Sequence, residues 1–275
     1  MINSNPDSQP GVIQKARELL ASKELLVVTG AGISTDSGIP DYRGAGRVEK
    51  HPLTFDEFMG SRANQARYWA RSYVGWSRVA LAEPNRGHFA LAQAEQLGIV
   101  QKIITQNVDG LHQRSGSKSV LELHGRLDRV ICSGCGDILS RNELDARIAF
   151  LNPDVYQDQD VEYTPDGDAE VEVGKNFRVP DCGACGAHFK PDVVFFGEQV
   201  PLMRVQESQE AVDRAEGVLV AGTSLTVNSG LRLIKRAQKR GIPIVIVNLG
   251  ETRGDHMATL KLQGSTSELL KEILF

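Results

Sequence analysis

The chain has 275 residues, of which 41% are hydrophobic and 24% charged, and its formal net charge is −4. This length can bury a sizeable core, as one large domain or as one domain that carries an insertion. The negative charge argues against a nucleic-acid-binding protein, because such a protein needs an excess of Lys and Arg to replace the counterions on phosphate. No apolar run reaches the roughly 18 residues that cross a bilayer. We therefore expect no membrane and no direct nucleic-acid partner.

The N-terminal residues give an expectation for the cellular location. Residues 1–11 are polar and lack the charged and apolar regions of a signal peptide. They are also not Arg-rich in the manner of a transit peptide. The expected location is cytoplasmic.

Apolar spacing predicts the start of an α/β fold. Residues 11–22 carry apolar side chains at helical spacing, and residues 24–29 form an apolar strand that runs into Gly30-Ala31-Gly32. We expect the glycines to open a second helix, since a strand, a glycine turn and a helix begin a doubly wound α/β fold. At the other end, Ser265 and Glu268 have capping-box spacing and predict a C-terminal helix.

Four further apolar segments predict strands of one parallel sheet, at residues 99–105, 120–123, 217–221 and 242–247. Near-continuous apolar strands suit a sheet that is buried on both faces. Polar or glycine residues follow each of these strands, and in such sheets ligands bind beyond the carboxyl ends of the strands. The sequence therefore predicts a binding site at that edge.

Two stretches interrupt the α/β pattern. Residues 46–86 are rich in aromatic side chains and arginine, which indicates a small helical insertion. Residues 128–189 contain all four cysteines and an acidic stretch that cannot build a core of its own. We interpret this second insertion as a zinc-held module with a long loop.

The cysteines form two C-x-x-C pairs, Cys132 with Cys135 and Cys182 with Cys185. Each pair supplies two thiolates on one turn, and four thiolates complete a tetrahedral zinc site with no position left for water. The pattern predicts one structural Zn²⁺, and zinc catalysis is disfavoured. Coincidental reduced pairs or a redox motif are the alternatives. His188 lies close by in sequence but is interpreted as a surface or packing histidine.

The glycine turn predicts a phosphate site. Residues 30–34 can place backbone N–H groups at a helix N-terminus, where they bind a pyrophosphate. The third glycine of G-x-G-x-x-G is missing, so a tight turn without a ligand is the alternative. No acidic residue about 20 positions on sits at a strand end to hold a ribose, which disfavours an ordinary dehydrogenase.

Polar residues at two strand ends predict a catalytic centre. Gln106, Asn107 and Asp109 can hold a carboxamide and a ribose through hydrogen bonds. His124, at the next strand end, is a candidate general base because histidine titrates near neutral pH. A single histidine is more often structural, and that interpretation is kept for the others, His51, His88, His112 and His256.

Taken in order along nearly the whole chain, these motifs resemble the sirtuin family of Sir2-type NAD-dependent protein deacylases. The matching segments are residues 30–43, 105–111, the pair His124-Gly125, the two cysteine pairs, residues 190–198, residues 222–227 and the pair Asn248-Leu249. The resemblance implies a Rossmann-like doubly wound parallel sheet and a smaller domain made of the zinc-binding module and the helical insertion. The implied large domain comprises residues 1–45, 87–127 and 190–275, and the small one residues 46–86 and 128–189.

The resemblance also implies the site residues. NAD would be the co-substrate, bound by Gly30, Ala31, Gly32, Ser34, Asp41, Tyr42, Arg43, Gln106, Asn107, Asp109, Gly222, Thr223, Ser224, Asn248 and Leu249. Val194 and Gly197 would pair with the backbone of an acylated-lysine substrate, while Phe196 would pack in the core. Beside a pyrophosphate, Arg43 would also be a charge-assisted donor.

A mechanism follows from the same resemblance. Nicotinamide leaves the ribose, and the acyl oxygen of the substrate captures the cationic centre. His124 removes a proton from a ribose hydroxyl, and Asn107 and Asp109 are the other catalytic candidates. Free lysine and O-acyl-ADP-ribose are released. A mono-ADP-ribosyltransferase that uses the same NAD site is the chemical alternative, and a zinc-ribbon nucleic-acid-binding module is the distant one.

The helical insertion and a segment of the zinc module resemble the class II, sirtuin-four-like branch, which suggests a bacterial member of it. The resemblance rests on residues 67–76 and 164–168, and the Tyr-x-x-Arg pair that reads a succinyl group is replaced by Tyr73-Val74-Gly75-Trp76. We therefore expect weak desuccinylation and a preference for acyl groups longer than acetyl. Arg67 and Arg71 could equally form a solvated helix face. Position 42 is Tyr where most members of the family have Phe. This difference does not change the expected function, because a Tyr ring can still cover the nicotinamide side.

Overall fold

The computed structural model describes residues 9–42, 53–155, 168–169 and 176–275. Its centre is a six-stranded sheet in the order β3-β2-β1-β7-β8-β9, in which all neighbouring strands are parallel. The strands are β1 (Leu25–Thr29), β2 (Val100–Thr105), β3 (Val120–Glu122), β7 (Gly217–Ala221), β8 (Ile244–Asn248) and β9 (Leu260–Gln263). The chain runs outward from β1 in both directions, which is the strand order of a doubly wound Rossmann-like fold.

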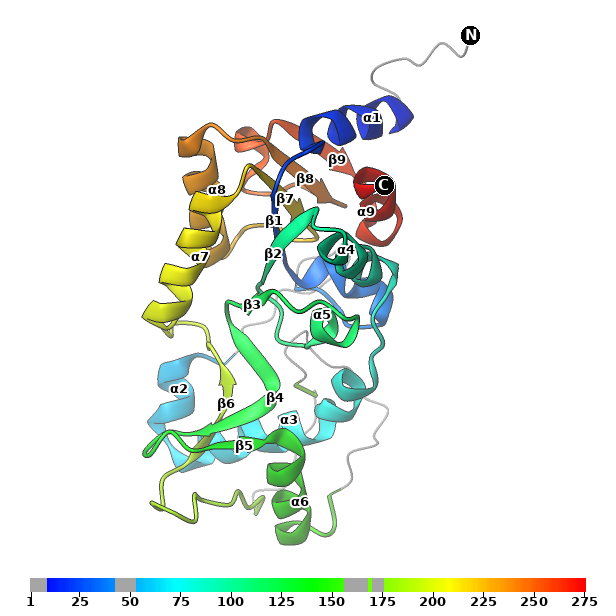
Figure 1. Ribbon diagram of the computed structural model, residues 1–275. Helices are drawn as coiled ribbons and strands as arrows, with labels where there is room; N and C mark the ends of the chain where they lie inside the picture. The colour runs from blue at the N-terminus through cyan, green and yellow to red at the C-terminus, as the bar shows by residue number, and fades with distance from the viewer. Residues whose placement is uncertain (1–8, 43–52, 156–167, 170–175) are drawn as a thin grey trace.

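Helices cover both faces of this sheet (Figure 1). One face carries α1 (Gln9–Leu20), α4 (Arg86–Gln96) and α9 (Thr266–Leu274), and the other carries α7 (Leu202–Arg214) and α8 (Asn228–Arg240). Side chains alternate along each strand, so that Leu25 and Val27 belong to the first core and Leu26 and Val28 to the second. Burial on both faces explains why the central strands β1, β7 and β8 are almost entirely apolar.

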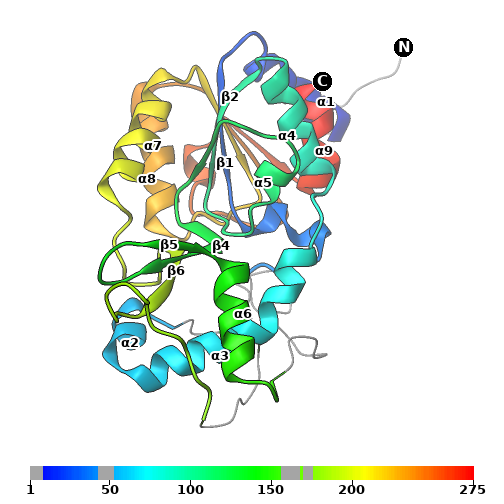
Figure 2. The same cartoon turned by 60° about the horizontal axis from the view of Figure 1, so that its bottom comes forward.

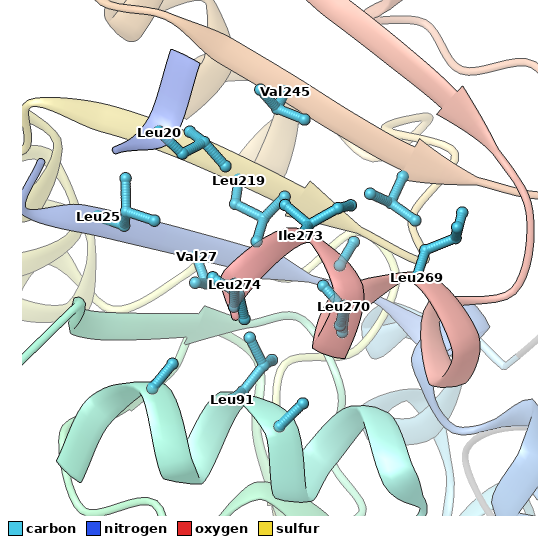
Figure 3. Packing of buried hydrophobic residues seen from close by; sticks show 14 of the residues in the cluster. Leu20, Leu25, Val27, Leu91, Leu219, Val245, Leu269, Leu270, Ile273 and Leu274 are labelled. Atoms are coloured by element: carbon cyan, nitrogen blue, oxygen red, sulfur yellow. The ribbon is translucent and has the colours of Figure 1, made fainter. Parts of the chain in front are cut away.

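The first core packs the C-terminal helix against the sheet (Figure 3). Leu269, Leu270 and Ile273 of α9 lie among Val27, Leu219 and other strand residues. Each of these α9 side chains is at most 3% exposed. Burying three such side chains contributes about 5–9 kcal/mol relative to leaving them in water, before the entropy cost of ordering them.

A smaller antiparallel sheet lies beyond the carboxyl ends of the parallel strands (Figure 2). Its order is β5-β4-β6, formed by β5 (Ile138–Ser140), β4 (Gly125–Cys132) and β6 (Phe189–Val193). It packs with α2 (Phe55–Gly60), α3 (Arg62–Leu81) and α6 (Arg141–Leu151) around one apolar core. The zinc-module segment and the helical insertion therefore share a core. The domain boundaries expected from the sequence remain a prediction.

Several local expectations need correction. The glycine turn does not open an α-helix, because residues after it form two short 3₁₀ turns, η1 (Ala31–Ile33) and η2 (Thr35–Ser37). Ser265 caps α9 through the N–H of Ser267, two residues on, and its Oγ also donates to Asp36. The edge strand β9 and the small sheet were not expected, since their polar sequences mask the strand pattern.

The remaining small elements of the described residues are α5 (Leu111–Arg114), η3 (Asp255–Met257) and two isolated bridges. These bridges join Thr54 to Phe196 and Asp181 to His188. Among the described residues, no helix is both long enough and apolar enough to cross a membrane. Expectations that concern Arg43, His51 and residues 164–167 fall outside the described residues.

Candidate functional site

A large cavity lies between the carboxyl edge of the parallel sheet and the small sheet, with a volume of about 1590 Å³. That exceeds the roughly 300–1,000 Å³ of a pocket for one small ligand. Every non-metal site residue expected from the sequence, Arg43 excepted, lines it. The ends of β1, β2, β3, β7 and β8 thus converge as the parallel topology requires, and the cleft has room for two ligands at once.

The glycine turn is built for packing against the neighbouring strand end. A Cβ at Gly30 would lie 2.6 Å from Cβ of Thr223, and one at Gly32 would lie 2.9 Å from the carbonyl oxygen of Gly222. Gly222 itself adopts a φ of +64°, and a Cβ there would lie 2.3 Å from the nitrogen of Ile33. The two turns therefore interlock, and glycine at all three positions is required by this contact.

Four backbone N–H groups of the same turn donate to carbonyl groups within the protein. Gly32 N–H donates to the carbonyl of Gly222 at 2.8 Å, and Gly30 N–H donates to Ala221 at 3.4 Å. The N–H groups of Ile33 and Ser34 donate within the turn, at 3.1 Å each. These four groups are engaged inside the protein, and the pyrophosphate site expected at this turn stays a prediction.

Three polar side chains form a connected group on the cleft floor. Ser34 Oγ donates to Asp109 at 2.7 Å, and Asn107 Nδ2 donates to Ser34 Oγ at 3.0 Å. Burial raises the pKa of Asp109, while the N–H of Leu111 and the hydroxyl of Ser34 oppose this rise. The arrangement fixes both residues that follow β2 against the turn that follows β1.

Gln106 joins three strand ends. Its Nε2 donates to the carbonyl of Thr29 at 3.2 Å and to Oγ1 of Thr223 at 2.9 Å. Its own carbonyl lies 3.0 Å from Nδ1 of His124. The side chain and backbone carbonyl of Gln106 thus fix the distances between the strand ends that carry Thr29, Thr223 and His124.

His124 is half-buried where the chain passes from β3 to β4. Because the Gln106 carbonyl can only accept, Nδ1 carries the proton and Nε2 of the neutral ring keeps its lone pair. Burial lowers the pKa of His124, the Gln106 carbonyl raises it, and the positive charge of Arg204 lowers it. The ring is therefore neutral at pH 7 and able to accept a proton, as a general base must.

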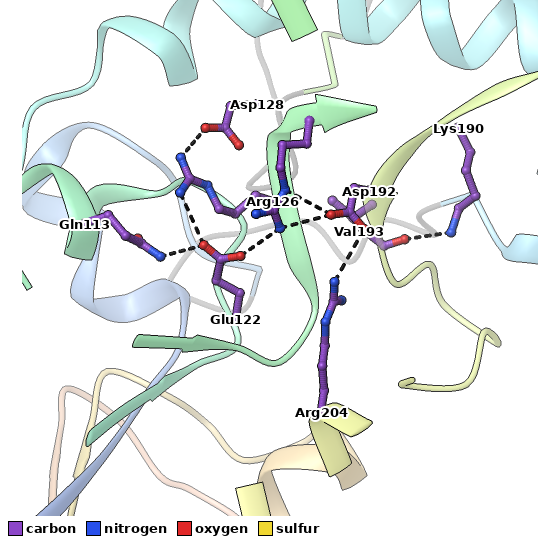
Figure 4. Close-up of polar contacts among 9 residues, drawn as sticks. Gln113, Glu122, Arg126, Asp128, Lys190, Asp192, Val193 and Arg204 are labelled. Atoms are coloured by element: carbon purple, nitrogen blue, oxygen red, sulfur yellow. Dashed lines mark hydrogen bonds and ion pairs between the residues drawn. The ribbon is translucent and has the colours of Figure 1, made fainter. Parts of the chain in front are cut away.

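A charge network ties the His124 segment to the small sheet (Figure 4). Glu122, two residues before His124, accepts from Arg126 and from Arg129, at 3.3 and 2.8 Å. Arg129 also bonds Asp192 of β6 at 2.9 Å, and Asp192 holds Arg204 of α7 at 3.4 Å. The network links β3, β4, β6 and α7. It also positions Arg204, whose positive charge lowers the pKa of His124.

The segment after β6 forms one wall of the cleft. Lys190 bonds Glu198 at 2.7 Å, and Glu198 accepts the N–H of Phe195 at 2.9 Å, which closes the loop on itself. Phe195 is 8% exposed and packs in the core, whereas Phe196 is 39% exposed and lines the cleft. The expected core role of Phe196 is therefore wrong, because the ring of Phe195 takes the buried place, where it packs against Phe58 and Tyr68. Its ring meets Tyr42 at 6.1 Å between centroids.

The four cysteines come together away from this cleft. Their sulfur atoms all lie within 4.8 Å of one another, with 3.4 Å between Cys132 and Cys185 and 3.7 Å between Cys135 and Cys182. Tetrahedral zinc with Zn–S bonds of about 2.3 Å requires sulfur separations of about 3.8 Å. The cluster therefore fits one structural zinc. His188 bonds Asp181 at 3.1 Å and is not among the ligands.

The helical insertion lies partly away from the cleft. Tyr68 lines it, but Tyr73 packs against Phe177 and is 5% exposed. Arg71 donates to the carbonyl of Ala169 at 3.0 Å, and Arg67 is exposed. The solvated-face interpretation thus describes Arg67 and not Arg71.

Several cleft residues were not foreseen from the sequence. They lie at the start of α8 (Asn228, Ser229, Arg232), after β8 (Glu251, Thr252, Arg253) and after β9 (Gly264, Ser265, Thr266). Their position at the ends of strands and helices could have indicated the cleft, but these residues do not form a recognisable ligand-binding motif. The most informative is Ser229, whose Oγ lies 2.8 Å from Nε2 of His124.

Comparison with known proteins indicates one family. The sequence pattern described as "Sir2 family" matches residues 30–229. An "NAD-dependent protein deacetylase 1" of Mycobacterium avium (strain 104) is 49% identical over 256 residues, which cover 92% of this chain and 91% of that protein. An "NAD-dependent protein deacetylase" of Bordetella bronchiseptica is 46% identical over 274 residues, with 98% and 99% covered.

Solved structures agree in fold. One of a Sir2–p53 peptide–NAD+ complex superposes with a TM-score of 0.76 at 32% identity, covering 95% of this chain and 97% of the other. One of Sir2Tm bound to a propionylated peptide gives a TM-score of 0.74 at 31% identity, with the same coverage. The similarity spans both sheets of the chain.

Proposed function

This chain belongs to the Sir2 family, and from that premise we propose that it is an NAD-dependent protein-lysine deacylase. The observation that carries the proposal is His124, a neutral imidazole fixed through Nδ1 by the Gln106 carbonyl inside a cleft with room for two ligands. Similar proteins are named deacetylases, and a similar structure holds both a peptide and NAD+.

NAD would occupy the side of the cleft formed by the ends of β1, β2, β7 and β8. Gln106, Asn107 and Asp109 would face its nicotinamide ribose, and Thr223, Ser224 and Asn248 its adenosine. When bound, NAD supplies a ribose whose bond to nicotinamide breaks and whose hydroxyls become nucleophiles. The role of the protein is to hold that ribose over His124 and to accept the proton of a ribose hydroxyl on Nε2.

The acylated lysine would enter between Gly197 and the start of α8. Val194 N–H already donates to the carbonyl of His124 at 2.9 Å, so Val194 would pair with a substrate backbone through its own carbonyl. Apolar side chains line the cleft on this side, among them Ile39, Leu53 and Tyr68. Such a lining suits an uncharged acyl chain.

We place acyl preference within the same proposal: groups longer than acetyl should be removed better, and succinyl poorly. The Tyr73–Trp76 stretch carries no arginine, and Tyr73 packs against Phe177. A negatively charged acyl end would therefore find, in this stretch, no bidentate partner of the kind that carboxylates need when they leave water. The propionylated peptide in a similar structure also supports a chain longer than acetyl.

The test is incubation with NAD and peptides that carry acetyl, propionyl, longer and succinyl groups, followed by mass spectrometry. We expect free lysine and O-acyl-ADP-ribose, both absent with His124→Ala. If lysine is never freed and label from NAD appears on protein, the chain is an ADP-ribosyltransferase. If acetyl is removed fastest, the deacylase assignment stands and the acyl preference is wrong.

A further inference from the structure

Both ring nitrogens of His124 have partners in the protein. Nδ1 donates to the carbonyl of Gln106 at 3.0 Å, and the Oγ of Ser229 lies 2.8 Å from Nε2. Since Nδ1 carries the proton of the neutral ring, Ser229 must donate to Nε2. The nitrogen that acts as the base is therefore held by a hydroxyl from α8.

Tight packing fixes the position of Ser229. It is the second residue of α8, and the next residue, Gly230, lies against the side chain of Gln106. A Cβ at Gly230 would lie 2.7 Å from Oε1 of Gln106, which leaves no room for a side chain. Gln106 thus holds the His124 ring with its carbonyl and the first turn of α8 with its side chain. This arrangement sets the contact between Ser229 and His124.

The hydroxyl of Ser229 can serve both charge states of the ring. It donates to Nε2 of the neutral imidazole, and after rotation it accepts from Nε2–H of the imidazolium. A hydrogen bond to a charged donor is roughly twice as strong as one between neutral groups. Ser229 therefore stabilises the protonated ring more than the neutral ring.

The other groups that face the ring differ in effect. Arg204 of α7 opposes the protonated state and the Gln106 carbonyl favours it. Arg204 is partly offset by Asp192 of β6, and Glu122, on the strand that leads to His124, is engaged by Arg126 and Arg129. Ser229 supplies the hydrogen bond on the side where the proton arrives.

We propose that Ser229 is a positioning residue for the base: its hydroxyl orients Nε2 of His124 and stabilises the imidazolium formed when this nitrogen takes a proton from a ribose hydroxyl. In that step the Ser229 O–H turns away and frees the Nε2 lone pair, the ribose O–H bond breaks and the Nε2–H bond forms. The electron pair of the broken bond stays on the ribose oxygen as the nucleophile, and Ser229 Oγ then accepts from Nε2–H. The inference rests on the proposed deacylase function for its role in turnover, but the contact itself does not.

The experiment is an NMR titration of the protein labelled at histidine Cε1, without NAD, in which His124→Ala assigns the resonance. We expect Ser229→Ala to lower the pKa of His124 by about 0.5–1, and Ser229→Thr, which keeps the hydroxyl, to restore it. Ser77→Ala, a half-buried helix serine outside the cleft, is the matched control and should change nothing. An unchanged or raised pKa in Ser229→Ala would overturn the proposal.

Kinetics adds a second readout. Ser229→Ala should lower kcat about 3–10-fold, change KM for NAD less, and move the acidic limb of the pH–rate profile to lower pH. Ser229→Thr should recover most of the rate. A fall in kcat with the limb unmoved would mean that Ser229 acts only on structure, and would contradict the proposal. If the wild-type protein frees no lysine while the NMR pattern is as expected, the proposed function fails and the contact stands.

Discussion

The imidazole rings of His88 and His112 pack against each other in the protein interior, with centroids 4.9 Å apart. His88 Nδ1 lies 3.3 Å from the N–H of Asn85, at the start of α4, and His112 Nε2 lies 2.9 Å from Oγ1 of Thr29, at the end of β1. Both rings are at most 1% exposed. The pair joins α4 and α5 to the strand that enters the glycine turn.

This pair predicts acid sensitivity. Burial lowers the pKa of His88 to about 4, and burial followed by the proximity of His88 lowers that of His112. The neutral rings therefore contribute stability that is complete above pH 6.5 and is lost as the pH falls toward 4. For His88 alone the loss is about 3 kcal/mol.

Urea denaturation between pH 7.5 and 5 checks this prediction. The free energy of unfolding should fall with pH in the wild type and fall less steeply in His88→Gln, since the variant lacks one titrating ring. His256→Gln, at an exposed position, should follow the wild type. Equal slopes in the wild type and His88→Gln would show that His88 is not the cause.

Replacement of the base should separate binding from chemistry. His124→Ala should bind NAD with an affinity close to that of the wild type and lose about 10²–10⁴-fold in kcat, the usual contribution of a general base. Calorimetric titration with NAD and a peptide assay measure the two quantities, with His256→Ala as the control. Retained turnover in His124→Ala would remove His124 as the base.

The interlocked turns predict an asymmetric response to glycine substitution. Gly222→Ala should cost at least about 2 kcal/mol of stability, because the residue has a positive φ and its Cβ would lie 2.3 Å from the nitrogen of Ile33. Gly60→Ala, with nothing within 4 Å of the added carbon, should be neutral or slightly stabilising. Thermal unfolding of both variants tests this, and equal melting temperatures would refute the close contact.

The cysteine cluster predicts a metal-dependent small sheet. Cys132→Ser should lose the one zinc per chain and lower the melting temperature, since binding of a structural zinc adds to the folding free energy. Ser133→Ala, next in sequence but not a ligand, should keep the metal. Elemental analysis measures the stoichiometry, and pure wild-type protein without zinc would contradict the assignment.

The sequence by itself determined the parallel sheet, the zinc site and the edge at which the cleft lies. These features depend on local patterns. Strands that are buried on both faces are largely apolar, and the two C-x-x-C pairs supply four thiolates. Polar residues at the ends of parallel strands must meet at one edge of the sheet. It also placed His124 beside Gln106, Asn107 and Asp109, because each directly follows a strand.

The tertiary structure decided what each group is free to do. The N–H groups of Gly30 and Gly32 donate to residues at the end of β7. Phe196 lines the cleft while Phe195 is buried, and Ser229 meets His124 across 105 positions of sequence. Each outcome depends on how distant segments pack, and the contact between Ser229 and His124 depends also on the rotation of α8 about its own axis. No local pattern specifies that rotation, since the buried contacts that fix it come from the rest of the chain.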